Sequence, residues 1–95
     1  MTITKRVTFI AKEGCEDKMK ELLTAMVAPS KAEDGCLFYD IFQLKDNRKK
    51  FMAAETWRDE KALDGHKTSA HYKIYKSSYE QYCDDKYSDD LEVLG

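Results

Sequence analysis

The sequence predicts one α+β domain in which helices cover one face of a four-stranded antiparallel sheet. Two observations indicate this fold. Apolar residues alternate at period two in four segments, and they recur at three- and four-residue spacing in two longer segments. The segments follow one another as strand, helix, strand, strand, helix, strand, which is the split βαβ or ferredoxin-like order. With 95 residues the chain can build one modest core, so residues 1–95 are expected to form a single domain.

The first strand is predicted over residues 2–12, where threonine and branched side chains alternate with charged ones. Gly14 ends this strand. From Cys15 the apolar spacing becomes helical, and acidic residues in the first turn suit the positive end of the helix dipole. Pro29 either kinks this helix or begins a second short one, because proline lacks a backbone donor. Gly35 ends the helical region.

A hairpin follows over residues 36–57. Its first strand is predicted at residues 36–45, and its second at residues 50–57. The four residues between them are polar and form a turn of hairpin length.

The strand at residues 36–45 is apolar on both faces. Leu37 and Tyr39 are expected on one face, and Phe38 and Phe42 on the other. Helices can cover only one face of such a sheet, so the second face needs another partner. A second copy of the same sheet would supply it, which predicts a homodimer whose sheets pack into an α+β barrel.

The last third of the chain is predicted as a helical stretch over residues 59–83, broken near residues 65–69. A polar segment at residues 84–90 is interpreted as a solvated face. Residues 91–94 alternate and are predicted to form the fourth strand.

Composition and charge exclude several classes of partner. A net charge of -2 with a pI of about 5.7 removes the electrostatic basis for binding nucleic acid or an anionic membrane surface. No apolar run exceeds four residues, whereas a spanning helix needs about 20. The three cysteines are widely spaced and odd in number, so we expect reduced thiols in a cytoplasmic protein.

Several short motifs resemble one known family. An E-x-W piece at Glu55 and Trp57 precedes an H-x-x-S-x-H piece at residues 66–71, which Tyr72 follows directly. Together with residues 28–37, these pieces resemble the antibiotic biosynthesis monooxygenase (ABM) domain family. That family includes quinol monooxygenases and other small enzymes of the dimeric α+β barrel type. The resemblance covers nearly the whole chain.

The resemblance implies oxygenation of a small quinol or electron-rich aromatic substrate by dioxygen, without metal, flavin or haem. Such a substrate can lose a proton and become an anion that itself donates an electron to dioxygen. The protein then supplies a dry aromatic pocket, a base and a donor that stabilises the oxyanion. The sequence contains no glycine-rich phosphate loop, metal-ligand motif or flavin fingerprint, so no cofactor or metal is expected.

His66 is the candidate general base, since an imidazole ordinarily titrates near pH 6.5 and suits removal of a phenolic proton. The alternative is a histidine that packs against a helix end. Glu55 would orient His66 through a hydrogen bond, unless it serves a dimer salt bridge or a buried backbone contact. His71 lies five residues after His66 and would point away from it on a continuous helix, which favours a structural role over substrate binding.

Aromatic residues supply the remaining candidates. Tyr72 is a possible proton donor, although tyrosines at helical spacing are more typical of a core. Trp57 and Tyr39 are expected to wall the pocket, Trp57 by stacking on a substrate ring. The predicted catalytic residues are therefore His66, Glu55 and Tyr72, and the predicted substrate-binding residues are Trp57, Tyr39 and His71.

Other functions remain open at this stage. An isomerase of a small carbonyl metabolite could use the same base and pocket, and it would not require dioxygen. A non-catalytic dimer that holds a small hydrophobic ligand is the alternative from another class. A haem-degrading relative is disfavoured, because such proteins carry an asparagine on the first strand, where this chain has Thr8, and its only asparagine is Asn47 in a turn.

Overall fold

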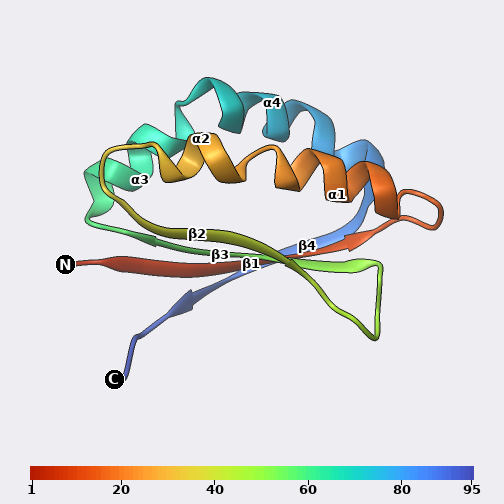
Figure 1. The fold of residues 1–95 in the computed structure, drawn as a ribbon, viewed down its shortest axis with the longest axis horizontal. Helices are drawn as coiled ribbons and strands as arrows, with labels where there is room; N and C mark the ends of the chain where they lie inside the picture. The colour runs from red at the N-terminus through yellow and green to blue at the C-terminus, as the bar shows by residue number, and fades with distance from the viewer.

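The computed structural model describes residues 1–95 and contains one four-stranded sheet with its helices on a single face (Figure 1). The strands are β1 (Ile3–Ala11), β2 (Cys36–Gln43), β3 (Lys50–Trp57) and β4 (Cys83–Leu91). The helices are α1 (Glu16–Thr24), α2 (Val27–Lys31), α3 (Glu60–Lys67), α4 (Ala70–Ser78) and the short 3₁₀ helix η1 (Tyr79–Tyr82). Each helix is too short or too polar to cross a bilayer.

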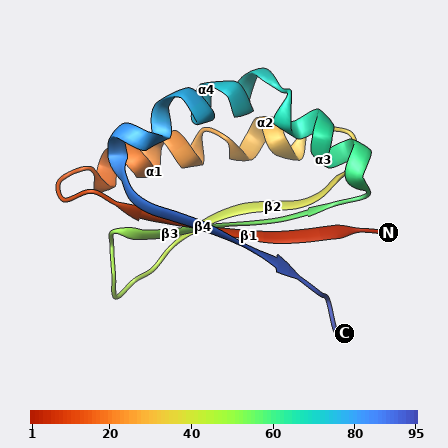
Figure 2. The same cartoon turned by 180° about the vertical axis from the view of Figure 1, so that it is seen from behind.

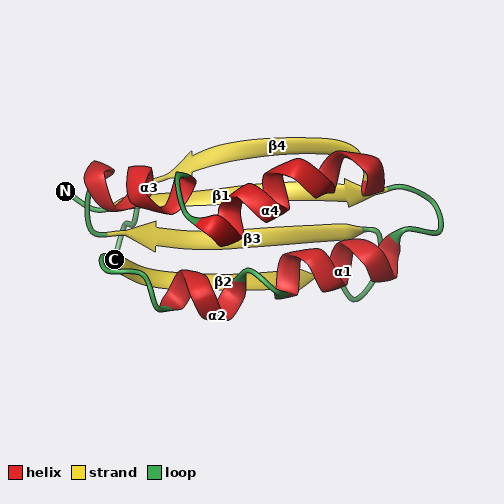
Figure 3. Ribbon diagram, turned by 90° about the horizontal axis from the view of Figure 1, so that it is seen from above, coloured by secondary structure: helices red, strands yellow, loops and turns green.

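The sheet order is β2-β3-β1-β4, and every neighbouring pair is antiparallel. This confirms the predicted α+β ferredoxin-like fold. Turned around, the molecule shows the same two layers, with the second face of the sheet uncovered (Figure 2). From above, α1 and α2 run along the β2 side, whereas the edge strand β4 projects beyond the helices (Figure 3).

The core lies between the two layers. Its largest fully buried apolar side chains are Trp57, Phe51, Met19 and Leu23. On the uncovered face, Phe38 and Phe42 are 45% and 46% exposed. The sheet therefore has one finished face and one apolar face that the chain leaves open.

The helix ends follow local sequence. Pro29 lies inside the separate helix α2, so the second of the two alternatives for this proline is correct. The predicted break in the last helical stretch is confirmed, since α3 ends at Lys67 and α4 begins at Ala70. Asp59 caps α3 by accepting from the backbone N–H of Ala62 at 2.9 Å, a contact that stabilises a helix by about 1 kcal/mol.

The prediction for the fourth strand was wrong. The strand is β4, which contains the acidic segment, and only Leu91 of the predicted strand belongs to it. Its charges are compatible with a strand because β4 is an edge, where charged side chains prevent pairing with another sheet. Asp89 accepts from Arg6 at 2.8 Å, and Asp90 lies 3.2 Å from the amino group of Lys5.

The prediction for Leu37 was also wrong. The register between β2 and β3 shifts between Cys36 and Phe38, which is the signature of a bulge. Leu37 is 57% exposed, while Tyr39 is buried on the helix side as expected. One extra residue in the strand thus turns Leu37 away from the core.

Candidate active site

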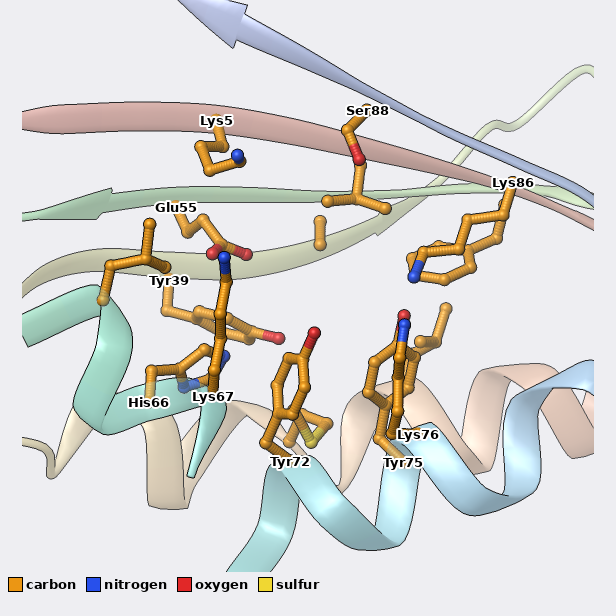
Figure 4. Close-up of a pocket in the computed structure, with 16 residues that line it drawn as sticks. Lys5, Tyr39, Glu55, His66, Lys67, Tyr72, Tyr75, Lys76, Lys86 and Ser88 are labelled. Carbon is orange, nitrogen blue, oxygen red and sulfur yellow. The ribbon is translucent and has the colours of Figure 1, made fainter. Parts of the chain in front are cut away.

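A pocket of about 250 Å³ lies between the helix-facing side of the sheet and helices α3 and α4 (Figure 4). Aromatic and aliphatic side chains from both layers form much of its wall, together with five titratable groups apart from the tyrosines and His66. Pockets that bind drug-sized ligands measure roughly 300–1,000 Å³. This one therefore suits a small molecule with few rings.

A carboxylate flanked by two histidines forms one end of the site. Oε2 of Glu33 lies 2.6 Å from Nδ1 of His66 and 2.8 Å from Nε2 of His71. An ionised carboxylate only accepts hydrogen bonds, so both of these ring nitrogens carry hydrogen. Nε2 of His66 is then left with a lone pair. A carboxylate that fixes the tautomer of an imidazole in this way makes its other nitrogen a base.

The turn after α2 places Glu33 beneath α3. Gly35 adopts a φ of +86°, and a Cβ atom there would lie 2.5 Å from the Cβ of Ala62 on α3. Only glycine fits this close approach and this backbone conformation. The backbone N–H of Arg58 then donates to the Gly35 carbonyl at 2.8 Å, which ties the turn to the end of β3.

Ser69 brings the two histidines to the same carboxylate. Its hydroxyl donates to the carbonyl of His66 at 2.6 Å and accepts from the backbone N–H of Tyr72 at 3.3 Å. Ser69 thus closes α3 and caps α4. On a continuous helix His71 would point away from His66, but the predicted break between α3 and α4 lets both imidazoles reach Glu33.

Aromatic rings surround His66, which is only 2% exposed. The Trp57 ring lies 4.5 Å away at an angle of 35°, and Tyr72 meets the imidazole edge-on at 5.1 Å. The ring of Tyr39 lies 5.7 Å away on the strand side. His66, Tyr39 and Tyr72 all line the pocket.

The proposed hydrogen bond between Glu55 and His66 is absent. Glu55 instead accepts from the indole Nε1 of Trp57 at 3.0 Å, because both side chains project from the same face of β3. Trp57 is fully buried behind His66 and does not line the pocket, whereas Glu55 does. Trp57 therefore supports the histidine and does not stack on a substrate in this arrangement.

His71 also lies outside the pocket wall, and its side chain is 20% exposed. Of the six predicted site residues, the structure brings four to the pocket: His66, Glu55, Tyr72 and Tyr39. Trp57 and His71 contact His66 from behind, at centroid distances of 4.5 and 5.7 Å.

Two tyrosine hydroxyl groups in the site remain neutral donors. Burial, followed by the nearby charge of Glu55, raises the pKa of Tyr39 well above its usual value. Burial, followed by the neighbouring hydroxyl of Tyr72, likewise raises the pKa of Tyr75. Both phenols can donate a hydrogen bond to an oxyanion.

Lysines form the other part of the pocket wall, and the sequence reasoning missed them as site residues. They are Lys5, Lys67, Lys76 and Lys86. One of them had a visible signal in the sequence, because Lys5 interrupts the apolar face of the first strand. Lys86 had none, since only the register of β4 places it opposite Phe9. Glu33 was missed as well, although it falls in the segment that resembles the family.

The three groups around Glu33 could also serve as metal ligands. Their ligand atoms lie within 4.8 Å of one another, and two imidazoles with one carboxylate form the set found in non-haem iron sites. In the structure these atoms bind each other instead. A metal would have to displace both hydrogen bonds and the hydrogens of both nitrogens.

Two known proteins that are similar in sequence carry the same provisional name. Rv0793 of Mycobacterium tuberculosis, provisionally named a monooxygenase, is 35% identical over 69 residues, which are 73% of this chain and 67% of that protein. YcnE of Bacillus subtilis, named in the same way, is 33% identical over 60 residues. The match covers 60% of this chain and 63% of YcnE, less than two thirds of that protein's length.

Solved structures agree over the full chain. PA3566 from Pseudomonas aeruginosa superposes with a TM-score of 0.94 at 33% identity, covering 99% of this chain and 95% of that one. The structure of Rv0793 gives a TM-score of 0.92 at 27% identity, with 100% and 97% coverage. The sequence profile described as antibiotic biosynthesis monooxygenase matches residues 2–77. The chain therefore belongs to the antibiotic biosynthesis monooxygenase family.

Proposed function

We propose that this protein is a cofactor-independent monooxygenase that oxidises a small quinol or electron-rich aromatic substrate with dioxygen. Family membership and the names of the two curated relatives support a monooxygenase-like role. The proposed setting is the cytoplasm, where the three free cysteines would stay reduced.

The observation that carries the proposal is the contact between Glu33 and Nδ1 of His66 at 2.6 Å, in the wall of an aromatic pocket. It leaves Nε2 of His66 as a preformed base. A buried imidazole held in one tautomer suits removal of a phenolic proton near neutral pH.

The reaction would begin when Nε2 of His66 takes the proton of a substrate hydroxyl. The resulting anion donates an electron to dioxygen, and the two radicals combine at a ring carbon. The imidazolium of His66 returns its proton to the resulting peroxide. Loss of the hydrogen on that ring carbon then breaks the O–O bond, so that one oxygen atom stays as a carbonyl oxygen, the other leaves as water, and the substrate supplies all the electrons. The hydroxyl groups of Tyr72 and Tyr39 stabilise the developing oxyanion.

Oxygen consumption tests this proposal directly. The purified protein is assayed against a panel of quinols and hydroxyanthrones, with and without added metal and flavin. We expect saturable oxygen uptake with at least one substrate, independent of either addition. If no substrate in the panel increases uptake above the rate without protein, the monooxygenase proposal fails.

The variant His66→Ala separates catalysis from structure. We expect turnover to fall by roughly 10²–10⁴-fold, the usual contribution of a general base. Asp64→Asn, an exposed position on the same helix, is the matched control and should leave turnover unchanged. Turnover without dioxygen would favour an isomerase, and a destabilised variant with no activity to lose would favour a ligand-binding dimer.

We also propose a homodimer that covers the open face of the sheet. Phe38 and Phe42 on β2 and Tyr87 on β4 are each more than 40% exposed, and the strand registers place all three on that face. Phe42→Asp should convert the dimer to a monomer in sedimentation equilibrium. A wild-type protein that sediments as a monomer at assay concentration would contradict this.

A further inference from the structure

We infer that the β4 end of the pocket binds an anionic group of the substrate through Lys86 and Lys76. This inference deepens the proposed function and rests on it for the identity of the reacting group. The ligand would be an oxidisable aromatic compound that carries a carboxylate or a phosphate.

The Lys86 side chain reaches the pocket from β4. It lies opposite Phe9 on β1 and projects to the helix side of the sheet. Its amino nitrogen lies 5.3 Å from the ring centroid of Tyr75, which lines the pocket, and 4.6 Å from that of Tyr79, which lies just outside the pocket wall. Figure 4 shows Lys86 reaching down from β4 and Lys76 rising from α4 beside Tyr75, at the opposite end of the pocket from His66.

Positively charged side chains outnumber negatively charged ones in the pocket wall. Four lysines line it, but Glu55 is its only carboxylate, and the indole of Trp57 already donates to Glu55. Lys5 has a partner in Asp90 at 3.2 Å. No carboxylate oxygen lies within 4.0 Å of the amino nitrogens of Lys67, Lys76 or Lys86.

This excess of positive charge occurs in a chain with a net charge of -2. Acidic side chains are therefore abundant, yet none lies within ion-pair distance of Lys67, Lys76 or Lys86. Burial, followed by the charge of Lys76, lowers the pKa of Lys86 to about 8, as expected for an ammonium group without a counterion. An anion at this position would contact both amines at once, reduce their mutual repulsion and accept charge-assisted hydrogen bonds from them.

The arrangement also fixes the orientation of the ligand. The anionic group would lie at Lys86 and Lys76, the ring would lie against Tyr72 and Tyr75, and the reacting hydroxyl would face His66 (Figure 4). A compound without the anionic group would leave two ammonium groups facing each other. The pocket should therefore discriminate between substrates by charge at the end that is remote from the chemistry.

Equilibrium binding tests this without any turnover. Three matched probes are titrated into the full-length protein by calorimetry at pH 7: 2-naphthoate, 2-naphthamide and 2-naphthyl phosphate. We expect at least one anion to bind about tenfold more tightly than the neutral amide, a ratio that corresponds to 1.4 kcal/mol. Comparing the two anions distinguishes a carboxylate from a phosphate. Equal affinity for all three probes would overturn the inference.

Variants then locate the preference. Lys86→Gln should abolish the tighter binding of the anionic probes. Lys86→Arg should retain it, because arginine keeps the positive charge. Lys73→Gln removes an exposed lysine of the same helix as Lys76 that lies outside the pocket, and it should change nothing. A preference that persists in Lys86→Gln would place the anion elsewhere and overturn the assignment.

The outcomes for the subsite and for the proposed function are separable. Anion preference without oxygen consumption would leave the subsite in place and remove the monooxygenase. Oxygen consumption on neutral quinols, with no preference among the naphthyl probes, would do the reverse. If both hold, anionic quinols should have the lower KM, and Lys86→Gln should raise that KM with little change in kcat.

Discussion

The two ends of the pocket differ in how their charges are satisfied. At the His66 end, Glu33 accepts from both histidines at 2.6 and 2.8 Å, and Glu55 accepts from Trp57 at 3.0 Å. At the Lys86 end, the amines of Lys86 and Lys76 lie over aromatic rings, and no carboxylate oxygen lies within 4.0 Å of either one. The carboxylates at the His66 end have hydrogen-bond partners within the chain, so we call it the complete end. The amines of Lys86 and Lys76 have no carboxylate partner, so we call theirs the incomplete end.

This difference suggests a separate function for each end of the pocket, catalysis at one and substrate recognition at the other. Groups that are already hydrogen-bonded are held in position before a ligand arrives, which is what a base needs to react without reorganisation. Charged groups without partners cost free energy in the empty protein and regain it when an opposite charge binds. We therefore assign the chemistry to the His66 end and recognition to the Lys86 end.

After His66→Ala, the largest expected effect comes from breaking the complete end at Glu33. Glu33→Gln keeps an acceptor oxygen but removes the charge that favours an imidazolium at His66, so kcat should fall by roughly 10–100-fold. Glu33→Ala removes the acceptor as well. Its free energy of unfolding should therefore be roughly 1–3 kcal/mol lower than that of Glu33→Gln.

Steady-state kinetics across pH and chemical denaturation together test this positioning role. The alkaline and acid limbs of the kcat profile should move in Glu33→Gln, which a purely structural residue would not cause. Unchanged kcat and an unchanged pH profile in Glu33→Gln would show that the carboxylate does not act through His66.

The fold could be predicted because its signals are local. Alternation and helical spacing identified three strands and both helical regions, and the hairpin at residues 36–57 indicated a sheet with apolar side chains on both faces. β4 was misplaced because an edge strand needs few apolar residues. Its pairing with β1 depends on neighbours such as Arg6, nearly the whole chain away, which periodicity cannot detect.

The site was predictable only in part, for the same reason. His66, Tyr72 and Glu55 attracted attention as reactive residue types within one segment. Glu33 lies 33 residues before His66, and only the fold brings the two together. Lys86 was overlooked because a lysine in an acidic segment is ordinarily solvated, and its position over the rings depends on the register of β4.

Between the two ends lies Tyr72, and Tyr72→Phe measures what its hydroxyl contributes. The hydroxyl faces the pocket (Figure 4), while the backbone N–H donates to the hydroxyl of Ser69. Loss of a donor to an oxyanion should lower kcat by about tenfold, with the thermal midpoint unchanged. Tyr79→Phe is the matched control outside the pocket wall. Equal kcat in Tyr72→Phe and wild type would assign the donor role to Tyr39.

A smaller effect is expected when the incomplete end is neutralised. Burial and Lys76 lower the pKa of Lys86 from its ordinary 10.5 to about 8, against weak opposing contributions from Cys83 and Glu80. Between pH 8 and 10.5 the unfolded chain keeps a proton that the folded chain has released, so wild-type stability gains with rising pH from this group. Below pH 8 the penalty for the charged amine is fully present.

Lys86→Met removes that penalty. The variant should be more stable than wild type at pH 7 by about 1 kcal/mol or less, since Lys86 is half-buried and solvent screens its charge. The advantage should shrink as pH rises from 8 to 10.5. Urea unfolding of both proteins at pH 7 and pH 10 provides the comparison. A variant that is less stable at pH 7 would show that the contacts with the rings outweigh the penalty.

Treatment with a metal chelator is expected to have the smallest effect. Glu33, His66 and His71 offer a ligand set for iron or zinc, but each of these ligand atoms is already used in a hydrogen bond. Dialysis against a chelator should therefore leave oxygen consumption unchanged. Added Zn²⁺ should inhibit, because binding at Nδ1 of His66 replaces the hydrogen that fixes its tautomer. Activity that is lost on chelation and restored by Fe²⁺ would instead make these three residues a metal centre, and His66 a ligand where we propose a base.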